Sequence, residues 1–164
     1  MNMPASPKPL SDAAQRVQDA LRARGFAHEV IELEVAVRTA KDAADAVGCE
    51  VAQIVKSLVF RGETSGRGVL VETCGANRVD LAKVAAACGE SVAMADPRSV
   101  REMTGFAIGG IPPLGHATEM LTLIDRDLLA LTGLWAAAGH PNSLFRLEPA
   151  DLVAMTGGTV TEVA

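Results

Sequence analysis

The sequence contains few aromatic residues and no tyrosine. Four Phe and one Trp make up 3% of its 164 residues. Binding surfaces that stack several bases on a row of aromatic side chains are therefore not expected. Hydrophobic residues nevertheless make up 49% of the chain and charged residues 21%, a composition typical of a packed globular protein. Ala, Val and Leu must fill most of its core.

Cysteine and histidine are too sparse and too scattered for a metal or disulfide framework. Cys49, Cys74 and Cys88 form no CxxC pair, and their odd number indicates a reducing compartment. The three histidines show no HExxH or comparable spacing. We therefore expect neither a metal nor another cofactor.

The chain also lacks a basic excess and any long apolar run. Its formal net charge of −5 argues against a broad surface for duplex DNA, although local basic residues could contact one end of a nucleic acid. The apolar runs are too short to span a membrane, and the N-terminus does not resemble a signal peptide. The sequence thus predicts no DNA partner, no membrane partner and a cytoplasmic location.

Capping residues and glycines divide the chain into short elements. Helix starts are predicted at Ser11, Thr39, Asp80, Asp96-Pro97 and Pro149, each followed by a glycine stop. Short helical turns are expected at 51–54 and near Leu128. The expected strands are 28–35, 57–60, 69–73, 120–124, 134–138, 144–147 and 159–163. Residues 1–10 are interpreted as a flexible leader. Residues 11–164 are interpreted as a single α+β domain with a mixed, mostly antiparallel sheet and flanking helices.

Lys56 lies between Ile54-Val55 and Leu58-Val59-Phe60, so an ammonium group is surrounded by apolar neighbours. A lysine in such a strand can point outward with its stem along the surface. Alternatively, it is a partly desolvated cation that binds a phosphate or polarises a carbonyl group. Spacing alone leaves both interpretations open.

Residues 107–116 (AIGGIPPLGH) form the least ordinary stretch of the sequence. Gly109, Gly110 and Gly115 allow a close backbone approach to a ligand, while two prolines stiffen the loop. Such a loop can direct amide groups at a carbonyl oxygen on which charge develops. The alternative is a rigid turn without a ligand. The glycine spacing matches neither a dinucleotide fingerprint nor a P-loop.

Several other side chains could take part in chemistry. His140, in the turn Gly139-His140-Pro141-Asn142, could orient water or a substrate hydroxyl, or have no such task. His116 is a weaker candidate. Cys74 at a strand end could be an exposed nucleophile, although a small apolar filler is the favoured interpretation. A Ser57–Lys56 nucleophile is disfavoured because neighbouring strand residues point to opposite faces.

Taken together, these segments resemble the YbaK/ProX family of free-standing aminoacyl-tRNA deacylases, which is related to the editing insertion of bacterial prolyl-tRNA synthetase. The similarity extends from about Ala14 to Val163 and keeps the order of the motifs. They are 38–41 (RTAK), 53–60 (QIVKSLVF), 77–83 (NRVDLAK), 104–116 (TGFAIGGIPPLGH) and 138–139 (AG).

The resemblance implies a curved mixed sheet with a pocket for the aminoacyl-adenosine end of tRNA, and ester hydrolysis without a metal or a covalent intermediate. It assigns catalytic roles to Lys56, Gly110 and His140. The substrate-binding residues that it implies are Arg38, Thr39, Ser57, Asn77, Gly109, Ile111, Pro112, Gly115, His116 and Gly139.

The resemblance leaves the substrate open. The alanine-editing branch of the family shares His140-Pro141 but has Asn at the position of Ser57, whereas the cysteine-editing branch has Thr there and lacks the His-Pro turn. Alanine, serine, cysteine and 2-aminobutyrate on tRNA(Pro) are the expected substrates, and prolyl-tRNA synthetase is an expected partner. The competing classes are a non-catalytic module that binds tRNA ends or a nucleotide, and a hydrolase dependent on Cys74.

Overall fold

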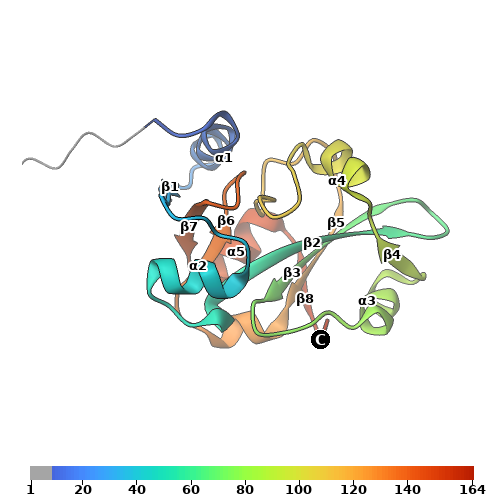
Figure 1. The fold of residues 1–164 in the computed structure, drawn as a ribbon. Helices are drawn as coiled ribbons and strands as arrows, with labels where there is room; N and C mark the ends of the chain where they lie inside the picture. Colours follow the sequence, from blue (N-terminus) through green and yellow to red (C-terminus); the bar gives the residue numbers. More distant parts are fainter. Residues whose placement is uncertain (1–8) are drawn as a thin grey trace, which may run out of the picture.

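The structure, a computed structural model, describes residues 9–164, so most of the expected leader 1–10 lies outside the described residues. A sheet runs through the molecule and carries helices on its two faces (Figure 1). The helices are α1 (Asp12–Ala23), α2 (Ala40–Val47), α3 (Leu81–Cys88), α4 (Pro97–Thr104) and α5 (Pro149–Thr156), with 3₁₀ turns η1 (Val51–Gln53) and η2 (Arg126–Ala130). The strands are β1 (Ile31–Glu32), β2 (Ile54–Gly62), β3 (Gly68–Cys74), β4 (Val92–Met94), β5 (Leu121–Asp125), β6 (Leu134–Ala137), β7 (Ser143–Leu147) and β8 (Thr159–Thr161).

The strands pair in the order β1-β7-β6-β2-β3-β5-β8. Strand β4 is not part of this order and pairs with β2 alone. Four pairings among the described residues are antiparallel, β1–β7, β2–β3, β2–β4 and β6–β7. The other three, β2–β6, β3–β5 and β5–β8, are parallel. The mixed, mostly antiparallel α+β sheet that the sequence predicts is thus confirmed, and β8 forms one edge of it.

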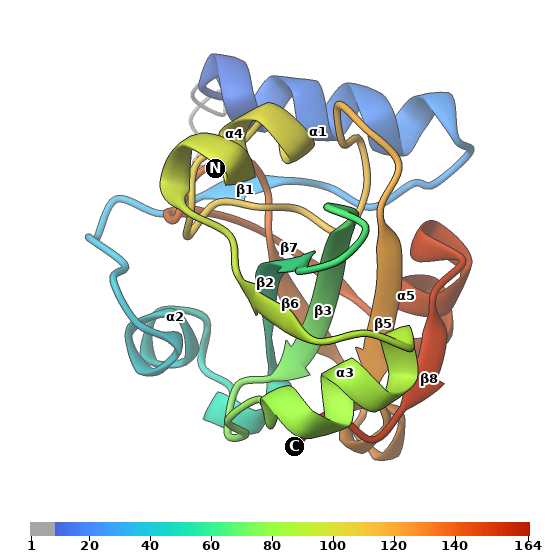
Figure 2. The same ribbon diagram turned by 90° about the vertical axis from the view of Figure 1, so that its right-hand side faces the viewer.

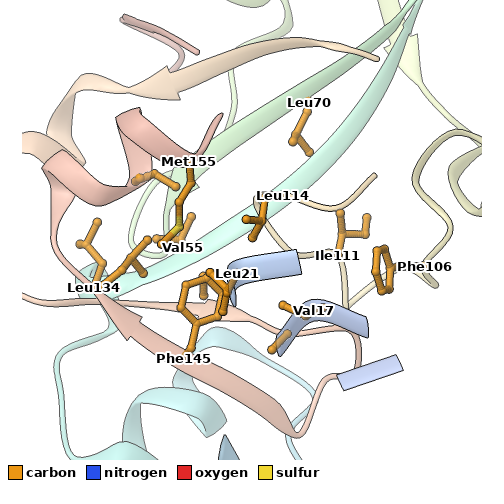
Figure 3. Close-up of a cluster of buried hydrophobic side chains, with 14 of the residues drawn as sticks. Val17, Leu21, Val55, Leu70, Phe106, Ile111, Leu114, Leu134, Phe145 and Met155 are labelled. Atoms are coloured by element: carbon orange, nitrogen blue, oxygen red, sulfur yellow. The ribbon is translucent and has the colours of Figure 1, made fainter. Parts of the chain in front are cut away.

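Alternate residues of the central strands enter two separate hydrophobic clusters. Val59 and Leu70 face the larger cluster, which α1, α4, α5 and the loop 106–114 cover. Phe60 and Val71 face the smaller one, which α3 and β4 cover. Figure 2 places α1 and α3 at opposite ends of the molecule. Figure 3 shows side chains of α1 beside those of the loop and of β7 in the larger cluster.

The helix starts follow the predicted capping chemistry. The side chains of Ser11, Thr39, Asp80 and Asp96 each accept a hydrogen bond from a main-chain N–H in the first turn of their helix. Pro149 occupies the first turn of α5, as predicted. These caps satisfy amide groups that the helix itself leaves unpaired.

Three elements differ from the prediction. The strand expected at 28–35 forms only over Ile31–Glu32, and Val92–Met94 is a strand that the sequence analysis missed. Lys56 lies inside β2 instead of preceding a strand. Short strands are hard to predict because a few alternating residues also fit a loop. Within residues 9–164, no helix combines the length and the apolar character needed to cross a membrane.

Candidate active site

A cavity of about 590 Å³ opens between α2, β2, the loop at 108–111 and the turn that joins β6 to β7. It is lined by Val37, Arg38, Thr39, Ala40, Ala43, Ile54, Val55, Lys56, Ser57, Leu58, Ile108, Gly109, Ile111, Ala137, Pro141 and Leu144. The cavity brings together six of the predicted site residues: Arg38, Thr39, Lys56, Ser57, Gly109 and Ile111.

The cavity lies where β2 has no neighbouring strand on one side. On that side β2 pairs with β6 only at Ile54 and Val55, and with β4 only from Phe60 onward. The main-chain amide of Ala95, which follows β4, donates a hydrogen bond to the carbonyl of Val59. The main-chain groups of Val59 therefore point to this side of β2. Main-chain groups of alternate residues point to the same edge of a strand. The main-chain N–H and C=O of Ser57, two residues before Val59, therefore point towards this gap.

Lys56 is held in place by the turn that follows β3. Its Nζ donates a hydrogen bond to the main-chain oxygen of Asn77 at 2.6 Å. The side-chain amide of Asn77 in turn donates to Asp125 at 2.9 Å and to Asp127 at 2.8 Å. Asn77 does not line the cavity. In this structure Asn77 anchors Lys56, and its contact with the substrate stays a prediction.

Asp125 is a residue of this site that the sequence analysis missed. Its carboxylate is buried at the end of β5 and accepts hydrogen bonds from the amide of Cys74 and from the side chain of Asn77. A buried carboxylate is retained only where hydrogen bonds or charges compensate its lost hydration. A charged residue that closes the apolar run of a strand, as in Leu123-Ile124-Asp125, could have revealed it.

Gly110 is confined by the turn between β6 and β7. Its amide donates to Ala107 and its carbonyl accepts from Gly139. A Cβ atom on Gly110 would lie 2.7 Å from the oxygen of Gly139 and 2.8 Å from the nitrogen of His140. In this structure the amide of Gly110 is bonded within the loop and the residue is buried, so Gly110 joins the loop to the turn, and its catalytic role stays a prediction.

The remaining loop residues of the prediction brace the loop instead of lining the cavity. The carbonyl of Pro112 lies 2.6 Å from Nε2 of His116, and burial lowers the pKa of that imidazole. Gly115 adopts a left-handed φ of +81° at a close approach to Ala20 of α1. Pro112, Gly115 and His116 thus fix the shape of the loop, while Gly109 and Ile111 reach the cavity.

The turn after β6 presents Pro141 to the cavity, and not its neighbours Gly139 and His140. Gly139 has a φ of +92°, and a Cβ atom there would lie 2.5 Å from the oxygen of Ala13. The exposed His140 accepts a hydrogen bond at Nδ1 from the amide of Asn142. In this structure the imidazole therefore stabilises the turn and is not among the groups that line the cavity.

Ser57 lies above a carboxyl group that the sequence analysis also missed. The Ser57 hydroxyl donates to Oε2 of Glu72 at 2.7 Å across the β2–β3 pair. Glu72 is fully buried, and this burial raises its pKa to about 8. The sequence does contain a signal for this group, because Glu72 directly follows the apolar run Val69-Leu70-Val71 within the predicted strand 69–73.

Cys74 is not placed as a nucleophile. The residue is buried and does not line the cavity, and its thiol donates to the oxygen of Ala52. Burial raises the pKa of this thiol and so disfavours the reactive thiolate. In the described part of the chain, no three His, Cys, Asp or Glu side chains gather as a group that could hold a metal ion.

Residues 34–155 match the model of the aminoacyl-tRNA editing domain. The chain belongs to this family. The resemblance inferred from the motif order is thereby confirmed, and all lining residues of the cavity fall within the matched segment.

Relatives of this editing domain span most of its length. It is 33% identical to the uncharacterized protein YwhH of Bacillus subtilis over 76% of this chain and 79% of the relative. It is 28% identical to a candidate Cys-tRNA(Pro)/Cys-tRNA(Cys) deacylase, EbsC of Enterococcus faecalis, over 76% of each chain. A crystal structure of a candidate trans-editing enzyme for prolyl tRNA synthetase has a TM-score of 0.91 and 51% identity, over 94% of this chain and 98% of that chain.

Helix α1 of the editing domain lies outside the matched segment but supports the site. Arg16 donates to the carbonyl of Gly105 and places its guanidinium over the ring of Phe106. Together with the contacts of α1 to Gly115 and Gly139, this fixes the two loops that border the cavity.

Proposed function

We propose that this editing domain hydrolyses the ester of mischarged aminoacyl-tRNA, and that its cavity takes the aminoacyl-adenosine end. The observation that carries this proposal is the position of Lys56 beside the open edge of β2. Arg38 and Lys56 are both lining residues, and no carboxylate occurs among the lining residues of the described chain. This charge favours an anionic ligand such as a terminal nucleotide.

The two sides of the cavity suit the two parts of such a ligand. Ala40, Ala43, Ile54 and Leu144 form an apolar wall of short and branched side chains. A small amino acid side chain would pack there. The polar side, with Lys56 and the main chain of Ser57, would hold the ester and the ribose.

Hydrolysis adds a water oxygen to the ester carbonyl carbon and breaks the bond to the ribose oxygen. The products are a free amino acid and a tRNA with a free terminal hydroxyl. Lys56 would stabilise the negative charge that develops on the carbonyl oxygen, and the neighbouring ribose hydroxyl would help to position the water. Hydrolysis of this activated ester requires mainly orientation and charge stabilisation.

We propose tRNA(Pro) carrying alanine, serine, cysteine or 2-aminobutyrate as the substrate, with prolyl-tRNA synthetase as a partner. The name of the Enterococcus relative includes Cys-tRNA(Pro), and the similar crystal structure is described as acting for prolyl tRNA synthetase. Both names support the carrier, while the apolar wall supports a small side chain.

The test is a panel of tRNA(Pro) charged with each of the four small amino acids or with proline, assayed for release of labelled amino acid. We expect hydrolysis of at least one small aminoacyl ester and protection of Pro-tRNA(Pro). Tight binding of tRNA(Pro) without release of any amino acid would favour a non-catalytic module that binds tRNA ends.

A further inference from the structure

Glu72 is a buried carboxyl group that contacts Ser57, one of the residues that line the cavity. It lies in the middle of β3, directly opposite Ser57 in β2, and none of its surface is exposed. Oε2 lies at a hydrogen-bond distance of 2.7 Å from the Ser57 hydroxyl oxygen, while the buried Oε1 has no partner among the described residues. An ionised carboxylate in such a setting lacks the hydrogen bonds that normally compensate its lost hydration.

The neighbouring strands supply no cation for Glu72. Lys56 precedes Ser57 in β2, but its Nζ bonds to the oxygen of Asn77. On the other side, Glu72 pairs with Ile124 of β5, and Asp125 next to it accepts from the amide of Cys74. The influences on the pKa of Glu72 are burial, which raises it, and the Ser57 hydroxyl, which lowers it.

Charged and titratable side chains on the other elements of this core cluster are held elsewhere. Among them, Arg16 bonds to the carbonyl of Gly105 and Arg24 to a carbonyl of α5, while His116 lies beside the carbonyl of Pro112 and His28 pairs with Asp151. In β3 itself, the thiol of Cys74 bonds to the carbonyl of Ala52. With burial as the dominant influence, Glu72 has a pKa of about 8 and carries a proton at neutral pH.

The proton on Glu72 changes what Ser57 can offer to the cavity. A carboxylic acid can donate its O–H to the Ser57 oxygen, which leaves the serine proton free to point into the cavity. An ionised Glu72 can only accept, so the serine proton must then point down at Oε2. The hydroxyl of Ser57 would be a donor towards the cavity in the first state and an acceptor in the second.

We propose that Glu72 is a positioning residue for deacylation, whose proton makes the Ser57 hydroxyl donate a hydrogen bond to the carbonyl oxygen of the aminoacyl ester. This inference rests on the proposed function. The donated bond strengthens as the carbonyl oxygen becomes negative, so it favours the transition state over the bound substrate. Loss of the proton withdraws the donor without moving any residue.

The first experiment measures kcat/KM for the best substrate of the panel from pH 6 to pH 9, for the parent, Glu72→Gln and Ser57→Ala. The side-chain amide that Glu72→Gln introduces always offers a donor to Ser57, so it imitates the protonated acid. After the rate of uncatalysed hydrolysis is subtracted, each kcat/KM value is divided by the value for Glu72→Gln at the same pH. This ratio cancels the titration of the amino group of the substrate.

We expect the parent ratio at pH 9 to be about one tenth of its value at pH 7, because only about a tenth of the Glu72 side chains remain protonated one unit above the pKa. Ser57→Ala should be slower at neutral pH and its ratio should not fall in this way. Glu90→Gln is the matched control, since Glu90 also accepts from a serine hydroxyl, that of Ser65, at 2.7 Å but is only partly buried and lies outside the cavity lining. It should keep the pH profile of the parent.

A ratio that stays flat in an active parent would overturn the proposal. If Glu72→Gln does not fold, the same fall should appear when the parent is divided by Ser57→Ala, and its absence there is equally decisive.

A second measurement does not depend on activity. The infrared carbonyl band of a protonated carboxylic acid should be present in the parent at pH 7, fall to about a tenth of that intensity at pH 9, and be missing in Glu72→Gln. Its absence at pH 7 in the parent would overturn the inference. A normal band together with no deacylation of any substrate would instead reject the proposed function.

Discussion

The Nζ atom of Lys56 lies 2.6 Å from the main-chain oxygen of Asn77. This carbonyl belongs to the turn after β3, which Asp125 and Asp127 hold through the side chain of Asn77. An ammonium group has three donors, and this contact uses one of them. The other two remain for a ligand in the cavity.

Lys56→Ala should lose most of the deacylation activity while keeping the fold. Loss of one preorganised electrostatic contact typically lowers the rate on the order of 10²–10³-fold. Lys41→Ala is the matched control, because Lys41 pairs with Asp45 on the exposed face of α2. Single-turnover deacylation and melting temperatures would be compared, and a folded Lys56→Ala protein with a near-normal rate would contradict the assignment.

Asp125→Asn should lower the stability of the protein. It should also lower the activity, because Asp125 holds Asn77, which anchors Lys56. Oδ2 of Asp125 accepts from the amide of Cys74 and from Asn77, and Oδ1 accepts from the amide of Asp127. The NH2 group that the substitution introduces must face at least one of these donors, so we expect a loss of about 1–3 kcal/mol in the free energy of unfolding. Deacylation should fall mainly in kcat, since Lys56 loses its anchor. Asp127→Asn changes the exposed partner of Asn77 and should have a smaller effect. Equal effects of the two variants on kcat would contradict a special role for Asp125.

Gly110→Ala should destabilise the protein instead of merely obstructing the cavity. The added methyl group would meet the main chain of Gly139 and His140 at 2.7–2.8 Å, and the turn would have to move. We expect a cost of about 1–3 kcal/mol, typical of overpacking. Gly66→Ala is a control for backbone strain alone, because its φ is +71° and no atom lies near the added group. Thermal unfolding would compare the two, and a Gly110→Ala protein as stable as the parent would contradict this packing.

Glu72 should make stability depend on pH in the direction opposite to most carboxylates. Its pKa rises from 4.5 to about 8 on folding, so the folded state binds the extra proton between these values. The free energy of unfolding should therefore decrease as pH rises from about 4.5 to 8, by a few kcal/mol in total, since one pKa unit corresponds to about 1.4 kcal/mol. Urea unfolding at pH 5, 6.5 and 8 should show this decrease in the parent and lose it in Glu72→Gln. A parallel pH dependence in both proteins would contradict it.

Cys74→Ser should remain active. The thiol is buried against the oxygen of Ala52, and the serine hydroxyl can donate to the same oxygen. Deacylation should also survive EDTA, as the sequence predicts from the lack of ligand spacing. Loss of activity in a folded Cys74→Ser protein would favour a cysteine-dependent hydrolase. Loss in EDTA that zinc restores would show that a metal site was missed.

The sequence by itself determined the family and most of the elements, although it missed the strand Val92–Met94. Capping residues such as Thr39 and Asp80 act on amides within their own turn, so their effect is local and readable from neighbouring residues. The order of the motifs predicted the family that the match over residues 34–155 confirmed. The presence of Lys56, Ser57 and Gly109 in one region was likewise expected from that resemblance.

Only the tertiary structure decided which of these residues meet and what each one does. Glu72 and Asp125 are separated along the chain by 15 and 48 residues from the partners Ser57 and Asn77, and nothing local indicates either contact. Likewise, Gly110 meets Gly139 because β6 and the loop converge on the edge of β2. Strand pairing brings distant residues together, and the burial that follows changes their protonation and occupies their hydrogen bonds.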